Sequence, residues 1–350
     1  MSELAKRAVQ NPLLQPEQLK ACRKDLKTIC VLNPGAFEYQ GRIGLLLRCC
    51  DTVAVPETDK VSAIIQKDQQ LEIRQFELND PKLNYSDPRA FSYDGEIFLT
   101  TFSTLLPAWS DDGGKSFSPD YEHRIFPKLP HASYGLEDAR VTRINEEYII
   151  ICTAVSANGA APAMLKTSDW KHFSQTELIL PPLNKDCALF PEKIEDHFYM
   201  LHRPTDPYCG NHIYLAESPD LSFWGKHHCL LKTRPNMWDC ARIGAGAAPV
   251  KTPDGWLEIY HGADESGRYA LGAFLLDLKN PRKVLARTRT PIMEPSAQYE
   301  CKGFYSNCIF SNGQIVKDDT IILFYGAADQ LTCRADFSIR EILDFLKSNC

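Results

Sequence analysis

Residues 168–173 read Ser168-Asp169-Trp170-Lys171-His172-Phe173, a turn-forming cluster that carries aromatic side chains. Related clusters contain Asp111 and Asp220, and the three aspartates are spaced by 58 and 51 residues. A repeat of roughly 50 residues has the length of one four-stranded blade of a β-propeller. The repeat therefore predicts a propeller.

Polar residues that directly precede predicted strands form a second series. Its members are Asp87, Asp138, Asp186 and Asp239, with steps of 51, 48 and 53 residues, and Asn33 and Asn307 extend it at the two ends. Counted in this way the chain has six blade starts. Spacing alone therefore allows five or six blades.

Between its ends the chain reads as β-structure. Short runs rich in aromatic and β-branched residues are bounded by turn residues, as is typical of strands. Examples are residues 96–102, 148–153, 198–201, 256–260 and 320–325. Helices are expected from about Pro16 to Lys27 and after the capping box that begins at Ser338. We therefore divide the chain into an N-terminal helical extension (1–29), a propeller (30–336) and a C-terminal helix (337–350).

The composition limits what the protein does and where it works. The chain has 350 residues, 44% of them hydrophobic, so it can bury a large core, yet no apolar run is long enough to span a bilayer. Its start lacks an apolar leader segment, and its 13 cysteines include no Cys-x-x-Cys pair, which favours reduced thiols and a cytoplasmic location. A formal net charge of -6 argues against nucleic acid as a partner.

Five basic side chains lie in or just before strand-like segments with apolar or small neighbours. They are Arg48, Lys185, Arg203, Arg242 and His261. A buried positive charge is costly unless an anion meets it, so this set indicates a small anionic ligand such as phosphate. Because the first strand of each propeller blade lines the central channel, we expect these cations to meet Asp138 and Asp329 in one axial pocket.

The most specific local string is Tyr134-Gly135-Leu136-Glu137-Asp138-Ala139-Arg140, which places two carboxylates beside an arginine at the start of a strand. Taken alone, it could equally be a salt-bridged surface turn. Four further strings accompany it in order along the chain. They are Asn33-Pro34-Gly35-Ala36 ahead of Arg48, residues 184–193 ahead of Arg203, Arg242-Ile243-Gly244-Ala245-Gly246 ahead of His261, and Gly326-Ala327-Ala328-Asp329. Together the five strings resemble glycoside hydrolase family 130, the inverting β-mannoside phosphorylases, from about residue 30 to residue 346.

The resemblance implies a fold and a site. Members of this family are five-bladed propellers, so we expect an all-β, five-bladed β-propeller with short N- and C-terminal helices. Asp138 matches the general acid, which in the family protonates the leaving oxygen through the 3-hydroxyl of the bound mannose. The phosphate-binding positions match Lys185, Arg203, Arg242 and His261, and the sugar-binding positions match Arg48 and Asp329. Neighbouring residues of the same strings are also expected to contact substrate: Asn33, Glu137, Arg140 and Asp186.

The reaction implied is cleavage of a β-linked mannoside by inorganic phosphate, which gives α-mannose 1-phosphate. Three strings resemble those of members that act on β-1,2-mannobiose or β-1,2-oligomannosides: Asn184-Lys185-Asp186, Arg242-Ile243-Gly244-Ala245-Gly246 and Gly303-Phe304-Tyr305. Phosphate is already an anionic nucleophile, so an inverting phosphorylase needs one carboxylic acid and no base, whereas an inverting hydrolase needs two carboxyl groups. Phosphate is then a co-substrate, and no cofactor, metal, nucleic acid or membrane is expected; the terminal helices could pack on a second subunit.

Two alternatives stay open. A β-mannosidase could use the same pocket if Glu258 or Glu300 faced it as a base. Glu258 is expected to point outward from its strand, whereas the sequence does not place Glu300. Hydrolytic members of the family are expected to lack the basic set, so the presence of Arg242 and His261 favours phosphorolysis. A propeller that only binds ligands would show the same repeats.

Overall fold

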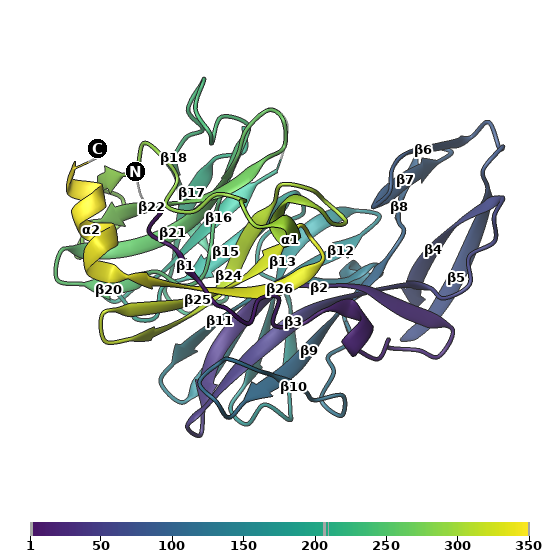
Figure 1. The fold of residues 1–350 in the computed structure, drawn as a ribbon, viewed down its shortest axis with the longest axis horizontal. Coiled ribbons are helices and arrows are strands. Elements are labelled where there is room, and N and C mark those ends of the chain that lie inside the picture. Colours follow the sequence, from purple (N-terminus) through teal and green to yellow (C-terminus); the bar gives the residue numbers. More distant parts are fainter. Residues whose placement is uncertain (1–2, 206–207, 209, 349–350) are drawn as a thin grey trace.

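The computed structural model describes residues 3–205, 208 and 210–348, which form a five-bladed β-propeller (Figure 1). Each blade is an antiparallel sheet with four main strands. Neighbouring blades contact one another all the way round, and the inner strand of the last blade packs against that of the first. The ring is therefore closed, and the predicted all-β, five-bladed architecture is confirmed.

The strands of each blade are given from the centre of the ring outward. The first blade contains β2 (Leu26–Tyr39), β3 (Arg42–Val53), β9 (Phe102–Ser110) and β10 (Ser118–Pro119). The second contains β11 (Gly135–Ile144), β12 (Glu147–Ser156), β13 (Gly159–Thr167) and β14 (Ser174–Leu178). The third contains β15 (Asn184–Leu189), β16 (Phe198–Pro204), β17 (Ile213–Ser218) and β18 (Gly225–Leu231).

The fourth blade contains β19 (Arg242–Ala245), β21 (Gly255–Ala263), β22 (Tyr269–Leu276) and β23 (Val284–Arg287), with the short β20 (Val250–Thr252) also paired to β21. The fifth contains β24 (Ile309–Lys317), β25 (Thr320–Ala327), β26 (Leu331–Ser338) and, as its outer strand, β1 (Lys6–Arg7). Four of the five strands predicted as examples are the second strands of blades, namely β12, β16, β21 and β25. The fifth, 96–102, is split by a bend at residues 100 and 101.

The first two blades are joined into one sheet. β11 meets β9 in a parallel bridge between Gly135 and Ser103. Gly135 has a φ of 112°, and a Cβ at this position would lie 2.6 Å from the backbone nitrogen of Ser103. Only glycine allows this close approach. The Gly-Leu-Glu-Asp string thus begins where two blades touch.

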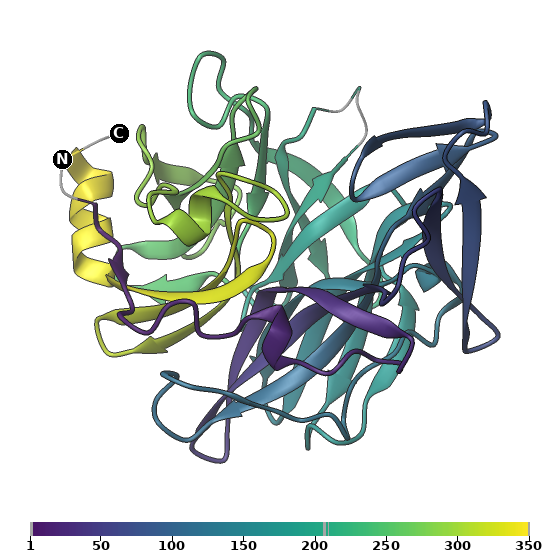
Figure 2. The same ribbon diagram turned by 45° about the vertical axis from the view of Figure 1, so that its right-hand side comes forward.

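An insertion separates the second and third strands of the first blade. It contains the hairpin of β4 (Lys60–Lys67) and β5 (Gln70–Glu77), followed by a small sheet of β6 (Leu83–Asp87), β7 (Ala90–Tyr93) and β8 (Glu96–Leu99). Figure 2 shows these dark-blue strands projecting from the ring. Asp87 ends β6, so it does not start a blade, and the count of six starts is wrong at this residue.

The turn clusters that suggested the repeat are equivalent turns between the third and fourth strands. Oδ1 of Asp169 accepts hydrogen bonds from the backbone N–H groups of Lys171 and His172. Asp220 bonds in the same way, and in the first blade the bonding residue is Asp112 rather than its neighbour Asp111. A fourth copy, at Asp277 in the fourth blade, has no aromatic residue close behind it and was missed.

The predicted N-terminal helix is wrong. Only Pro16–Gln18 form a short 3-10 helix, and β2 begins at Leu26. Between them the backbone is used for tertiary hydrogen bonds, as when the N–H of Cys22 donates to Oδ2 of Asp51 at 2.7 Å. Such contacts override the helical propensity of the segment. The extension instead supplies β1, which pairs with β26 and completes the last blade (Figure 2).

The predicted C-terminal helix is confirmed as α2 (Ile339–Ser348). Its start is capped by Ser338, whose Oγ accepts a hydrogen bond from the N–H of Glu341 at 3.2 Å. Ile342, Leu343 and Leu346 pack into the core of the last two blades. No helix among the described residues is long and apolar enough to cross a membrane.

Candidate active site

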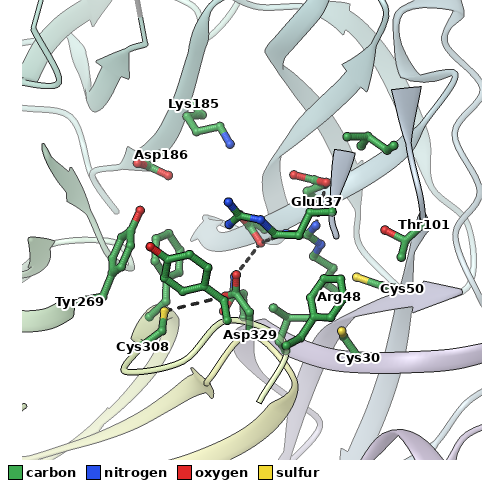
Figure 3. Close-up of a pocket in the computed structure, with 18 of the residues that line it drawn as sticks. Cys30, Arg48, Cys50, Thr101, Glu137, Lys185, Asp186, Tyr269, Cys308 and Asp329 are labelled. Carbon is green, nitrogen blue, oxygen red and sulfur yellow. Dashed lines mark hydrogen bonds and ion pairs between the residues drawn. The ribbon is translucent and has the colours of Figure 1, made fainter. Parts of the chain in front are cut away.

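A cavity of about 240 Å³ lies at the centre of the ring and receives side chains from all five blades (Figure 3). Nine of the eleven residues predicted for the site line it. They are Asn33, Arg48, Glu137, Asp138, Lys185, Asp186, Arg203, Arg242 and Asp329. The remaining two, Arg140 and His261, lie behind its wall. The prediction that residues far apart in sequence meet at one axial pocket is thus confirmed for the nine.

Three of these residues occupy β-bulges of inner strands. Asn33, Asp138 and Asp186 have φ values of 44°, 50° and 55°, and strand pairing shifts register around each of them. Asparagine and aspartate tolerate this left-handed conformation better than most residues, and a bulge re-aims a side chain. At Asn33, Asp138 and Asp186, three of the periodic polar residues, the bulge therefore directs the side chain into the cavity.

Asp138 provides the central carboxylate. Its Oδ1 accepts hydrogen bonds from Nδ2 of Asn33 at 2.9 Å and from Nη1 of Arg48 at 3.1 Å. Burial acts to raise the pKa of this carboxyl, but the charges of Arg48 and Lys185 and the bond from Asn33 outweigh it, so the pKa lies below its ordinary value. With these neighbours Asp138 is a carboxylate at neutral pH.

One side of the cavity, the acidic side, carries the carboxyl groups of Glu137, Asp138 and Asp329, and Arg48 binds the first two of them. Its Nη2 donates to Oε1 of Glu137 at 2.7 Å, and its Nε donates to Oγ of Ser103 at 3.2 Å. Asp329 lies on the same side, where burial and the charge of Asp138 raise its pKa above the ordinary value despite Arg48. Asp138 and Asp329 are therefore two carboxyl groups whose surroundings push their pKa values in opposite directions.

The other side of the cavity is cationic. Oδ2 of Asp186 holds Arg203, with Nε at 2.7 Å and Nη2 at 2.6 Å, and Nη1 of Arg242 donates to the hydroxyl of Tyr269 at 3.0 Å. Lys185 forms no ion pair with any described residue. Three cations thus face one carboxylate here, and the surplus charge suits an anion with several acceptor oxygens.

Arg140 does not line the cavity but connects neighbouring blades through its guanidinium group. Its Nε donates to the carbonyl oxygen of Gly246 at 2.7 Å, and its Nη2 donates to that of Ala245 at 2.8 Å. Nη1 donates to the carbonyl oxygen of Asp138 at 3.1 Å, and Nη2 lies 3.2 Å from Oδ1 of Asp186. These bonds tie the second, third and fourth blades together. The expectation that Arg140 touches substrate directly does not fit this placement.

His261 is fully buried one layer behind the cavity. Its Nε2 lies 3.3 Å from Oδ2 of Asp186, and its ring packs against Phe310 with 4.1 Å between ring centres. A Cβ on Gly244 would come within 2.5 Å of the same Nε2, so glycine at 244 makes room for the contact. In this structure His261 acts on the cavity through Asp186, and its predicted direct contact with phosphate remains a prediction.

The two candidate bases do not face the cavity. Glu300, in α1 (Gln298–Cys301), binds Arg7 through two hydrogen bonds of 2.8 and 3.0 Å and accepts another from the hydroxyl of Tyr325. Glu258 was expected to point outward, and that is wrong: its exposed fraction is 0%. Its Oε1 accepts a hydrogen bond from the N–H of Gly246, and burial raises the pKa of its carboxyl well above the ordinary value. Burial therefore favours the neutral form of the Glu258 carboxyl within the fourth blade.

Glu258→Gln should stabilise the protein more at pH 8 than at pH 5. The unfolded carboxyl releases its proton above its ordinary pKa, whereas the folded one keeps it, so wild-type stability falls as pH rises across this window. Glutamine keeps the acceptor for Gly246 and has no proton to lose. The gap between variant and wild type should grow by about 1.4 kcal/mol per pH unit between the two pKa values. Denaturant unfolding at the two pH values, with the exposed Glu146→Gln as control, measures the gap, and a constant gap would contradict the buried neutral acid.

Several residues that line the cavity could not be recognised from the sequence. Arg89 comes from the insertion, where Asp87 holds it at 2.8 Å, and its guanidinium stacks on the ring of Tyr305 at 4.7 Å. Tyr269 and Phe304 also line the cavity. Asp87 was noted only as a member of a repeat to which it does not belong. Among the described residues no group of three or more histidine, cysteine or acidic side chains could hold a metal ion.

Residues 99–348 match the sequence model of a family described as beta-1,4-mannooligosaccharide phosphorylase. The chain belongs to glycoside hydrolase family 130. It is also 39% identical over 345 residues to the beta-1,2-mannobiose phosphorylase of Listeria innocua, with 97% of each sequence covered. A 1,2-beta-oligomannan phosphorylase of Thermoanaerobacter is 40% identical over 222 residues, which cover 59% of this chain and 70% of the relative. The predicted family is confirmed, and the protein is an enzyme.

Solved structures agree with this assignment. The beta-1,2-mannobiose phosphorylase of Listeria innocua, solved in complex with beta-1,2-mannobiose, superimposes with a TM-score of 0.95 over 99% of each chain. A structure reported for family 130 hydrolases that target beta-1,2 mannosidic linkages in Candida mannan superimposes with a TM-score of 0.74 at 18% identity. At that identity the second likeness shows the shared fold alone. The two reactions therefore have to be separated by the residues of the cavity.

Proposed function

We propose that this enzyme cleaves β-1,2-linked mannobiose or short β-1,2-oligomannosides with inorganic phosphate and releases α-mannose 1-phosphate. One observation carries the proposal: Lys185, Arg203 and Arg242 form a cationic wall in the same cavity as Asp138, the carboxyl that matches the general acid of the family. An inverting phosphorylase requires a site for an anionic nucleophile and one acid. The β-1,2 linkage is favoured because the Listeria innocua relative, which matches nearly the whole chain, is named a beta-1,2-mannobiose phosphorylase.

Each side of the cavity has a role in this reaction. Arg48, Asn33 and Asp329 orient the mannosyl unit, and the cationic wall directs a phosphate oxygen to the anomeric carbon from the opposite face. The new carbon–oxygen bond forms as the bond to the leaving sugar breaks. The leaving oxygen takes a proton that Asp138 supplies through the 3-hydroxyl of the mannosyl unit, the relay that family membership suggests.

Phosphate also explains how Asp138 becomes an acid. The charge of Lys185 contributes to the low pKa of the Asp138 carboxyl. A phosphate anion bound to Lys185 offsets that charge, so the pKa of Asp138 rises when the nucleophile is present. Nucleophile binding and protonation of the acid are thereby linked, which disfavours reaction with water.

Hydrolysis is the less favoured reaction because Glu137 and Asp186, two other carboxylates of the cavity, are bound in ion pairs. Glu137 pairs with Arg48, and Asp186 pairs with Arg203. Asp329 lies on the acidic side of the cavity, where burial, Arg48 and Asp138 are the largest influences on the pKa of its carboxyl. No described carboxylate is thus left beside the cations to activate a water molecule.

Phosphate dependence tests the proposal. We expect β-1,2-mannobiose to be consumed only when phosphate is present, with mannose 1-phosphate and mannose formed in equal amounts. A panel of manno-disaccharides with other linkages, assayed in parallel, ranks the linkage. Equal rates of sugar release with and without phosphate would show a hydrolase.

The described cysteines are all free thiols, which supports a reducing compartment such as the cytoplasm as the place of action.

A further inference from the structure

Two cysteines face the acidic side of the cavity. Cys30 in β2 and Cys50 in β3 are direct partners across the two strands, and both line the cavity. Figure 3 shows their sulfur atoms on the same side as Arg48. Directly opposed residues of antiparallel strands have Cα atoms roughly 4.5–5.5 Å apart, within the span of roughly 4.4–6.8 Å that disulfides bridge. The backbone therefore already places this pair for a disulfide.

The two thiols interact, and they do so unequally. A hydrogen bond from Cys30 lowers the pKa of the Cys50 thiol, and the nearby charge of Arg48 lowers it further against the effect of burial. The same bond raises the pKa of Cys30. Cys50 is the member of the pair whose thiolate is favoured by the charge of Arg48 and by the contact with Ser103. This is the arrangement of a nucleophilic cysteine with a resolving partner.

The pair is connected to the sugar-binding residues through Ser103. Sγ of Cys50 lies 3.5 Å from Oγ of Ser103, and the same oxygen accepts the hydrogen bond from Nε of Arg48 at 3.2 Å. Arg48 in turn holds Glu137 and Asp138. A change at the Cys50 sulfur therefore reaches the groups proposed to bind and protonate the sugar.

We propose that Cys30 and Cys50 form a reversible redox modification site, where hydrogen peroxide converts them to a disulfide that weakens sugar binding. The Cys50 thiolate attacks one peroxide oxygen, the O–O bond breaks and hydroxide leaves. The Cys30 sulfur then attacks the Cys50 sulfenic sulfur, forms the S–S bond and releases a second hydroxide. The Cys30 proton and one proton from solvent convert the two hydroxides to water. Two thiols are oxidised and one peroxide is reduced.

A third cysteine of the cavity provides an internal control. Cys308 also lines the cavity, but burial and the charge of Asp329 raise the pKa of its thiol well above the ordinary value. Its Sγ donates to Oδ1 of Asp329 at 3.9 Å, and its bridge partner on the neighbouring strand is Tyr269 rather than a cysteine. Cys308 should therefore stay reduced under conditions that oxidise Cys50.

The test treats the intact enzyme with hydrogen peroxide and maps its cysteines by mass spectrometry after blocking free thiols. We expect a peptide in which Cys30 is joined to Cys50, a free Cys308, and a rise in KM for the mannoside on the order of tenfold, as for loss of one good hydrogen bond. A thiol reductant should restore the original KM. Cys50→Ser should be insensitive to peroxide relative to its own untreated sample, and Cys30→Ser should form no disulfide and leave Cys50 as the sulfenic acid, whereas Cys308→Ser should stay sensitive.

Two outcomes would overturn the proposal. One is oxidation of other cysteines while Cys30 and Cys50 stay free, and the other is an unchanged KM once the pair is joined. The predicted effect on KM depends on the proposed function, but the peptide map does not. An enzyme that shows no phosphorolysis even when fully reduced would refute the function, while the map would still decide whether the pair is a redox site.

Discussion

Asp138→Asn should lower kcat for phosphorolysis of β-1,2-mannobiose by about 10²- to 10⁴-fold, the usual contribution of a general acid. Asparagine keeps an Oδ1 that can accept the hydrogen bonds from Asn33 and Arg48, so the fold and the sugar site should survive. The variant also removes one negative charge beside the cationic wall. Its KM for phosphate should therefore stay level or fall while turnover collapses.

Leaving-group dependence separates a lost acid from a damaged site. A p-nitrophenyl β-mannoside has a leaving group that needs little protonation, so Asp138→Asn should lose much less activity on it than on mannobiose. Steady-state kinetics with both substrates, together with thermal unfolding of the variant, gives the comparison. Equal losses on the two substrates would show that Asp138 serves the structure of the site rather than proton transfer.

Lys185→Gln should raise KM for phosphate by about 10- to 100-fold, because a hydrogen bond to a charged group is worth about 1.5–3 kcal/mol. Lys185 is the cleanest cation to remove, since it has no ion-pair partner among the described residues that would be left with an uncompensated charge. KM for the mannoside should change little. The exposed Lys171→Gln, which removes the same charge from an outer turn, is the matched control and should behave as wild type.

The same variant makes a prediction about pH. The charge of Lys185 helps to lower the pKa of Asp138, so its removal raises that pKa. An acid catalyst is active while it is protonated, and its activity falls as pH rises through its pKa. At saturating phosphate the alkaline limb of the kcat profile should therefore move to higher pH in Lys185→Gln. A shift to lower pH would contradict the proposed interaction between Lys185 and Asp138.

Much of this site was predictable because its determinants are local. The carboxylates of Asp169 and Asp220 accept hydrogen bonds from backbone N–H groups two or three residues later in the chain. Asn33, Asp138 and Asp186 adopt left-handed backbone conformations that their residue types favour. Such features recur in several copies of the repeat and are visible in the sequence. The convergence of distant cations then followed from the geometry of a propeller.

The failures came from tertiary structure. Glu258 lies in β21, a strand buried on both faces, so the alternation rule for half-buried strands did not apply to it. The N-terminal segment pairs with a strand more than three hundred residues away in the chain, and no local pattern reveals such a partner. Arg89 reaches the cavity from an insertion outside the repeat. In each case a long-range contact determined the position of the residue.

The configuration of the first sugar phosphate formed tests the proposed mechanism most directly. Proton and phosphorus NMR spectra recorded during the first turnovers of β-1,2-mannobiose with phosphate should show α-mannose 1-phosphate as the initial product. This is the product of a single displacement by phosphate held on the cationic wall opposite the acid. Initial formation of β-mannose 1-phosphate, or of free mannose alone, would contradict this mechanism.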